Sequence, residues 1–343
     1  MALTRRDFLY LVPVFAASAY ACTTGGQGPK LTNASRTMSV REPTTSVAST
    51  ILAFTPETPQ TREVLTGLSD ELQGNYRLVT VRLDSANEAN VLTESIDRYK
   101  PSALVLINNT SVTAYRKYQE LKGGQAFPPA VIVMASFLES QTSQLSCATG
   151  ISYEVPLITA VTNLRKLVTL SRERVGVVVR APLRGFVDNQ IRLASREKVT
   201  VTLEEVDAAP NPSEIKRAIR RLKSRADVLW ILNDDRLLTP QLISDAWVPG
   251  LDERPWVPSI VGAPSLVSAR NPFGTFAVLP DHAALGAQVS DMLDDIASND
   301  WKVPGGTAIQ LPVSTTTTID LGQVKERFAL QPDALQQVDK ILE

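Results

Sequence analysis

The residues best suited to metal binding and nucleophilic catalysis are scarce in this chain. Its 343 residues include one histidine, His282, and two cysteines, Cys22 and Cys147. A structural zinc site normally takes four Cys or His ligands, and a Ser–His–Asp triad requires a histidine. The sequence contains no glycine-rich phosphate loop either. We therefore expect a protein that is not an enzyme and that holds no metal and no other cofactor.

Charged side chains point to a different chemistry, the binding of a small polar molecule. Asp234, Asp235 and Asp281 can hold an ammonium group through charge-assisted hydrogen bonds, with helix capping as the alternative. Arg180 can hold a carboxylate bidentately, and an ordinary surface arginine is the equal alternative. We expect His282 to be a polar residue in the first turn of a helix.

The elements that position these residues are short apolar runs, which predict buried parallel strands at residues 51–54, 103–107, 130–135, 175–179 and 227–232. Helical patterns separate the strands, so the sequence predicts an α/β fold with doubly wound parallel sheets. The order of elements repeats: Ile51 to Val175 and Ala103 to Asp227 are both 124 residues. The repeat predicts two Rossmann-like lobes with a cleft between them.

Polar residues come directly after these strands, where ligands bind in open parallel sheets. The same residue types also cap the helices that follow such strands, so the two interpretations stay open for any single residue. The candidate ligand-binding residues are Thr55, Glu57, Asn108, Asn109 and Ser136 in the first lobe, Arg180, Asp234 and Asp235 in the second, and Asp281.

The N-terminus has the pattern of an export signal. Residues 1–21 combine Arg5 and Arg6 with a short apolar stretch, and residues 4–9 resemble a twin-arginine motif. Cys22 stands where a bacterial lipoprotein carries its lipid, and plain cleavage before an unmodified Cys22 is the alternative. Residues 22–48 are poor in large apolar residues and predict a flexible tether. We expect export by the twin-arginine or general pathway to the periplasm, with a lipid anchor in the outer membrane.

Cys147 is the other cysteine of the chain, and a lipid on Cys22 excludes a disulfide between the two. We therefore expect Cys147 to be a small buried residue.

Residues 150–152, the 175–179 strand, residues 227–235 and the 276–286 turn resemble bacterial ABC-transporter substrate-binding proteins, in the subgroup that includes tryptophan- and tyrosine-type binders. The resemblance covers roughly residues 49 to 330. It implies the type I periplasmic-binding-protein fold, with crossovers near residues 148–153, 263–278 and 310–319. It places lobe 1 at 49–150, completed by about 281–311, and lobe 2 at 151–262, with about 312–343 crossing near the hinge. Asp234 and Asp281 stand at acidic positions of the family.

The resemblance implies capture of a small polar or amino-acid-like ligand for a membrane permease of an ABC transporter. The segment at residues 247–258 is unusually rich in Trp and Pro, which motivates the alternative of an envelope scaffold or sensor that binds another envelope protein. The net charge of −1 gives no reason to expect nucleic acid as a partner.

Residues 214–225 carry six basic side chains beside an apolar stripe of Ile215, Ile219 and Leu222. This pattern fits the solvated face of an amphipathic helix, and contact with anionic lipid or a partner is the alternative.

Overall fold

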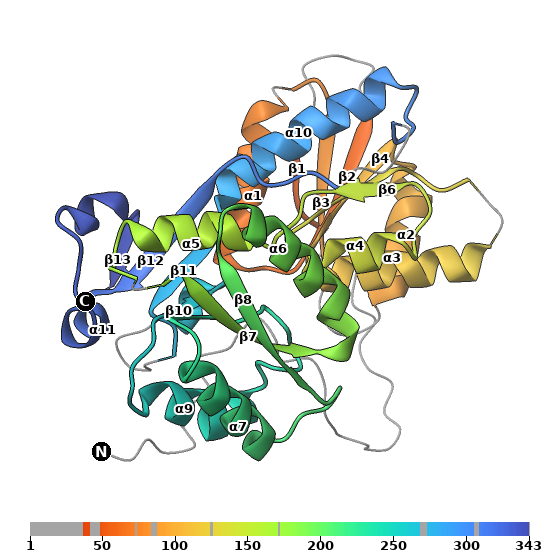
Figure 1. Ribbon diagram of the computed structural model, residues 1–343. Helices are drawn as coiled ribbons and strands as arrows, with labels where there is room; N and C mark the ends of the chain where they lie inside the picture. The colour runs from red at the N-terminus through yellow and green to blue at the C-terminus, as the bar shows by residue number, and fades with distance from the viewer. Residues whose placement is uncertain are drawn as a thin grey trace, which may run out of the picture. The chain divides into compact units, whose positions relative to one another are not determined.

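The computed structural model describes residues 37–41, 49–72, 74–83, 88–123, 126–170, 172–267, 273–304 and 309–342. The chain divides into two compact units (Figure 1). The first lobe consists of the described residues up to Tyr153 together with the described part of Pro280–Ser314. The second lobe consists of the described parts of Glu154–Leu279 and Thr315–Glu343.

The first lobe has a six-stranded sheet in the order β1-β3-β2-β4-β5-β6. Strands β2 to β6 run parallel, and β1 pairs antiparallel with β3 at the edge. The central strands are fully buried, as their continuous apolar runs predict. The strands are β1 (Thr37–Arg41), β2 (Thr50–Thr55), β3 (Arg77–Arg82), β4 (Ala103–Ile107), β5 (Ala130–Val133) and β6 (Ala148–Gly150).

Helices cover both faces of this sheet. Side chains of α1 and α10 pack on one face, and those of α2 and α3 pack on the other. The helices are α1 (Pro59–Glu71), α2 (Glu88–Tyr99), α3 (Asn108–Lys122), α4 (Leu138–Thr142) and α10 (His282–Ser298). Because α10 belongs to the first lobe, the chain returns to this lobe after it has built the second sheet.

Two glycines let α1 and α10 pack side by side (Figure 1). A Cβ at Gly67 would lie 2.1 Å from the carbonyl oxygen of Ala283, and a Cβ at Gly286 would lie 2.1 Å from that of Val64. Both distances are far below van der Waals contact, so any larger residue would push the two helices apart.

The second lobe has a seven-stranded sheet in the order β13-β12-β11-β10-β9-β7-β8. The neighbours from β8 to β11 are parallel, and β12 is parallel to β13. The strands are β7 (Arg174–Arg180), β8 (Thr200–Val206), β9 (Val228–Trp230), β10 (Ser259–Val261), β11 (Phe276–Pro280), β12 (Thr315–Asp320) and β13 (Lys340–Leu342).

The helices of the second lobe are short except for α6 and α7. The apolar stripe of α7 packs on the sheet in one core cluster with residues from the segment that follows β9. Helix α5 packs on α6, and Gln190 of α6 accepts the Leu157 N–H at the start of α5, at 3.0 Å. The α-helices are α5 (Leu157–Arg165), α6 (Arg184–Arg196), α7 (Pro212–Lys223), α8 (Pro240–Leu242), α9 (Val248–Asp252) and α11 (Leu321–Arg327). Four single turns complete the lobe: Ala181–Leu183, Ile243–Trp247 (a π-helix), Pro264–Leu266 and Ala334–Gln337.

The two sheets share one strand order, because β3-β2-β4-β5-β6 corresponds to β8-β7-β9-β10-β11. The predicted α/β class with two Rossmann-like lobes is therefore correct. Two details differ from the sequence-based expectation. The second lobe runs on to Leu279 rather than ending at 262, because β11 joins its sheet. Residues 37–41 form the edge strand β1 inside the stretch predicted as a tether, because backbone pairing with β3 orders them.

Candidate functional site

The carboxyl edge of the first sheet begins with Thr55 and Glu57. Thr55 ends β2 and is fully buried, and its hydroxyl donates to the Pro56 carbonyl at 2.8 Å. The Glu57 carboxylate forms ion pairs with Arg82 at 2.6 Å and Arg62 at 3.3 Å. Both candidate residues therefore make local contacts, and Glu57 sits in a surface cluster whose charge is compensated.

Asn109 and Ser111 connect the loops at this edge through uncharged groups. The Asn109 side-chain oxygen accepts the Ser136 N–H and the Gln141 amide, both at 2.9 Å. The Ser111 hydroxyl lies 3.0 Å from the Phe54 carbonyl oxygen. These contacts bring together candidates that follow β4 and β5, as their positions in the sequence predict.

The same edge contains strained backbone. Asn108, Met134 and Phe137 have positive φ angles of 80°, 57° and 53°. Such angles are uncommon for residues other than glycine and cost of order 1–3 kcal/mol each, and they cluster at functional sites. Asn108 is the first residue of α3, and the other two flank Ser136. Asn tolerates the left-handed region, but Met and Phe do not favour it, so no sequence signal identifies the positive φ of Met134 and Phe137.

The carboxyl edge of the second sheet is held by a buried ion pair. The Arg180 guanidinium donates from Nε and Nη2 to the two carboxylate oxygens of Asp234, both at 2.7 Å. The side chains of Arg180 and Asp234 are 13% and 1% exposed. Arg180 also donates to the Ala208 carbonyl at 3.1 Å, and Asp234 accepts the Arg236 N–H at 2.9 Å.

The pair changes how these two candidates are interpreted. In the ligand-binding interpretation, Asp234 holds a ligand ammonium group and Arg180 holds a ligand carboxylate, but here each charge compensates the other. Direct ligand contact by either residue stays a prediction. Asp235, the next residue, is exposed.

Asp281 caps a helix, which is one of the two roles considered for it. Its carboxylate accepts the N–H groups of Ala283 and Ala284 at 3.0 and 3.2 Å, at the start of α10. Asp281 belongs to the first lobe, whereas Asp234 and Asp235 belong to the second. The three carboxylates therefore do not form one cluster within a lobe.

His282, in the first turn of α10, links two distant segments of the first lobe. Its ring Nδ1 lies 2.9 Å from the Glu63 carboxylate, and its Nε2 lies 3.1 Å from the Tyr153 hydroxyl. The histidine is 7% exposed. The predicted helix-start position is correct, but its two partners lie 219 and 129 residues away, and no sequence pattern connects them.

The Trp- and Pro-rich segment at residues 247–258 contributes Trp247 and Leu251 to the core of the second lobe. The Trp247 indole N–H donates to the Leu237 carbonyl at 2.8 Å. The guanidinium groups of Arg254 and Arg327 lie 4.5 and 5.0 Å from the centre of the Trp256 ring. Buried Lys223 donates to the carbonyls of Gly250 and Glu253, and burial lowers its pKa. The unusual composition therefore has a packing explanation.

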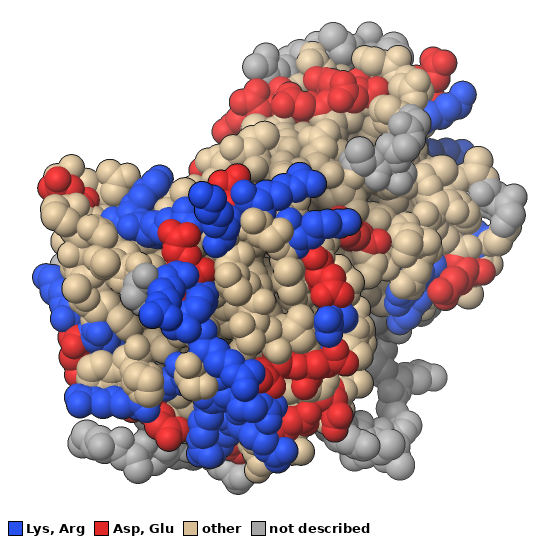
Figure 2. Space-filling model, viewed as in Figure 1, with Lys and Arg blue, Asp and Glu red and all other residues tan. Residues whose placement is uncertain are grey.

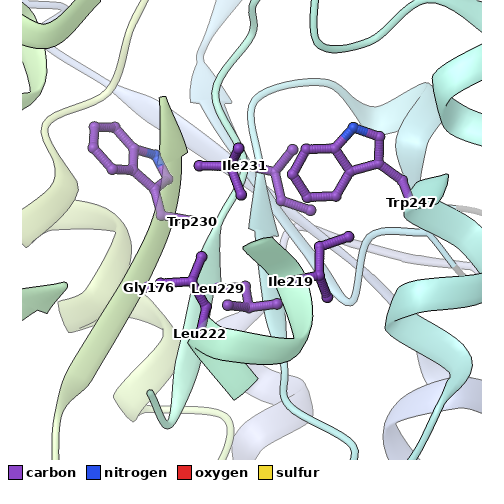
Figure 3. A pocket seen from close by; sticks show the side chains of 8 residues that line it. Gly176, Ile219, Leu222, Leu229, Trp230, Ile231 and Trp247 are labelled. Carbon is purple, nitrogen blue, oxygen red and sulfur yellow. The ribbon is translucent and has the colours of Figure 1, made fainter. Parts of the chain in front are cut away.

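Figure 3 shows an apolar gap on the α7 face of this lobe, next to Trp247. The gap has no room for a water molecule, so it is a packing irregularity rather than a ligand site. Its lining residues are Gly176, Val178, Ile219, Leu222, Leu229, Trp230, Ile231 and Trp247.

Three further predictions concern metals, membranes and cysteines. Within the described residues, no group of three or more His, Cys, Asp or Glu side chains is placed to hold a metal ion. The described part of the chain also contains no helix that is both long and apolar enough to cross a membrane. Cys147 is exposed rather than buried, because it precedes β6 in a surface loop. Cys22, the export signal and the start of the tether lie outside the described residues.

Comparison with known proteins identifies the fold of the chain but does not assign it to a family. No protein-family model matches the chain, and no curated protein does. A solved structure described as the ABC domain of Streptococcus pneumoniae in complex with L-Trp has a TM-score of 0.55 and 14% identity, covering 87% of this chain and 100% of that one. A ligand-free, open substrate-binding protein with adhesive properties from Clostridium difficile has a TM-score of 0.59 and 13% identity, covering 87% and 99%. A conserved domain protein of Vibrio cholerae has a TM-score of 0.56 and 15% identity, covering 86% and 99%.

These likenesses define a class by its architecture. The chain has the two-lobed α/β fold of type I periplasmic-binding proteins. At identities of 13–15%, the likeness supports a shared fold and nothing beyond it.

Proposed function

We propose that the protein is an extracytoplasmic solute-binding protein, which captures a small polar or amino-acid-like solute at the carboxyl edges of its sheets and delivers it to an ABC importer. The observation that carries the proposal is the first-lobe edge. There Asn109, at the start of α3, accepts hydrogen bonds from the loop after β5 and from α4, and three residues with positive φ lie beside these contacts. Backbone strain persists where the surrounding structure holds it and is often found at functional sites, although Glu173 and Lys198 at the amino edge of the second sheet also have positive φ.

The fold supports this assignment, because ligands bind at the carboxyl ends of strands in open α/β sheets. The neighbours support it as well. One is named as a complex with L-Trp and another as a substrate-binding protein. An amino-acid-like ligand, of the kind bound by tryptophan- and tyrosine-type proteins, is the finer part of the proposal. A lipid anchor at Cys22 and a membrane permease as partner complete it.

A thermal-shift screen of the purified protein against amino acids, sugars, nucleosides and polyamines tests solute binding. A ligand present at 100 times its dissociation constant stabilises the folded state by about 2.7 kcal/mol. We expect one chemical class to raise the melting temperature. A broad library that leaves the melting temperature unchanged would contradict the proposal.

A pair of variants locates the site. Asn109→Ala removes the link between two first-lobe loops, so we expect it to reduce the ligand-induced shift. Asn189→Ala is the matched control, because Asn189 lies on α6 and its described side-chain contact is with Arg192. Equal ligand shifts in both variants would place the site away from the first-lobe edge.

Mass spectrometry of the N-terminus tests the anchor. We expect a lipid on Cys22 as the first residue, and an unmodified Cys22 would rule the anchor out.

A further inference from the structure

The second lobe has a strongly basic stretch that the solute-binding role does not use. Residues 165–225 contain 15 Lys and Arg against 7 Asp and Glu, although the whole chain has a net charge of −1. Figure 2 shows Lys and Arg side chains gathered where α7 lies in Figure 1. Five exposed members define what we call the basic surface: Arg172, Arg196, Lys198, Arg217 and Arg225.

The basic surface lies mainly at the amino edge of the second sheet. Strands β7 and β8 are parallel, so Arg172 and Lys198, which precede them, lie at the same edge. Helices α6 and α7 connect parallel strands and end at this edge, near Arg196 and Arg225. The Arg180–Asp234 pair lies at the opposite, carboxyl edge. The basic surface is therefore separate from the proposed solute site.

The charge of this surface is uncompensated within the described part of the chain. None of its five members has an acidic side chain within ion-pair distance there, and the nearby acids are engaged elsewhere. Glu173 pairs with Arg165, Asp227 with Arg174 and Glu204 with Arg221. Glu197 is an exposed acid at the same edge and offsets one positive charge.

The helix dipole explains only part of this surface. Basic residues in the last turn of a helix stabilise it, and Arg196 of α6 has that position. Arg172 and Lys198 lie outside the helices, Arg217 lies before the last turn of α7, and Arg225 lies after its end. The dipole therefore accounts for one of the five cations, and the other four are exposed to solvent without it.

We propose that the basic surface binds the anionic head groups of a lipid membrane. Protein interfaces are anchored by aromatic and other large apolar side chains. The large apolar side chains that are exposed in the described residues lie elsewhere, at Leu121, Leu311, Val313, Leu335 and Ile341. A surface of long, flexible cations without apolar anchors recognises charge rather than shape, which is how polybasic segments bind anionic lipid.

The test is vesicle binding by the full chain carrying Cys22→Ser, which excludes an attached lipid. Vesicles of phosphatidylcholine mixed with phosphatidylglycerol are compared with pure phosphatidylcholine, at low and high salt. We expect binding to the anionic vesicles in excess of binding to the neutral ones, and we expect salt to remove the excess.

Two triple variants of the same chain assign that excess to the basic surface. Arg196→Gln, Arg217→Gln and Arg225→Gln remove three of its charges, and we expect roughly 100-fold weaker binding to the anionic vesicles. Lys117→Gln, Lys302→Gln and Lys325→Gln remove three exposed charges elsewhere and should leave the affinity nearly unchanged. The melting temperature of each variant confirms that it is folded.

Equal loss of affinity in the two triple variants would overturn the proposal, as would equal binding of the parent chain to both kinds of vesicle. Binding to a soluble polyanion without binding to vesicles would also overturn it, in favour of an acidic macromolecule.

Discussion

In the first lobe, hydrogen bonds between uncharged groups link the start of α3 to β2 and to the loop after β5, whereas in the second lobe one ion pair links the end of β7 to the loop after β9. Asn109 and Ser111 make the first set of contacts, and Arg180 with Asp234 makes the second. The two sheets have the same strand order, so the difference lies in the side chains at their carboxyl edges.

The difference has a physical consequence for binding. A hydrogen bond between uncharged groups contributes about 1 kcal/mol net, so a ligand can replace it at little cost. Separating a buried, bidentate ion pair leaves two charges without partners and costs several times more. We therefore expect a ligand to rearrange the hydrogen bonds of the first-lobe edge more easily than the ion pair of the second-lobe edge.

The largest test of this comparison is to break the ion pair. Arg180→Met leaves Asp234 buried without its partner, and we expect a loss of about 3–5 kcal/mol in the free energy of unfolding, measured in urea. Arg180→Met with Asp234→Leu removes both charges and should recover most of that loss. A single variant as stable as the parent would show that the pair does not hold the second-lobe edge.

A second test compares a closely packed glycine in the first lobe with an open one in the second. Gly286→Ala places a methyl group against α1, and we expect it to destabilise the protein by about 1–3 kcal/mol. Gly185→Ala is the matched control. Apart from its chain neighbours and the backbone of its own helix, nothing lies within 4 Å of a Cβ there, and alanine favours the helix by about 0.5–1 kcal/mol. Thermal unfolding of both variants measures the contrast, and equal melting temperatures would contradict the close approach of α1 and α10.

A third test measures how much the Asn109 hydrogen bonds contribute to the free energy of unfolding. Asn109→Ala removes the acceptor for the Ser136 N–H and the Gln141 amide, so we expect a loss of about 1 kcal/mol. Urea unfolding measures this loss. A loss as large as that of Arg180→Met would remove the distinction between the two edges.

The smallest expected effect is the alkaline pH dependence that Tyr76 gives to the first lobe. Burial, together with a hydrogen bond to Asp294, raises the pKa of Tyr76 to about 12. The neutral phenol is favoured in the folded state, so its stabilising contribution is complete below about pH 10 and is lost as the pH rises through about 12. Arg–Asp pairs such as Arg174–Asp227 keep their charges in this range.

Tyr76→Phe should therefore lose less stability than the parent chain between about pH 10 and 12. Urea unfolding at each pH measures this loss. An alkaline profile identical to that of the parent chain would show that Tyr76 does not contribute.

The sequence predicts the lobes because buried parallel strands are continuous apolar runs. The separation of 124 residues between the runs at Ile51 and Val175 recurs between those at Ala103 and Asp227. The sequence also places Asn109 and Ser136 at one edge, since parallel strands end together. It does not predict that Arg180 and Asp234, which are 54 positions apart, bind each other, because no pattern in the intervening sequence selects this pairing. Backbone strain at Met134 and Phe137 is equally invisible, because their residue types disfavour it.

The packing of α10 on α1 constrains the order in which the chain folds. The contact between Glu63 and His282 spans 219 residues, and the whole second sheet up to β11 is made between them. Until α10 is synthesised, only α1 covers this apolar face of β2, β4 and β5, and part of the face stays uncovered. Such an uncovered face is prone to aggregation, and contacts this distant in sequence form slowly. A growing chain therefore cannot complete its first lobe first, and we expect a fragment ending at Leu279 to remain insoluble even with every strand of the first sheet present.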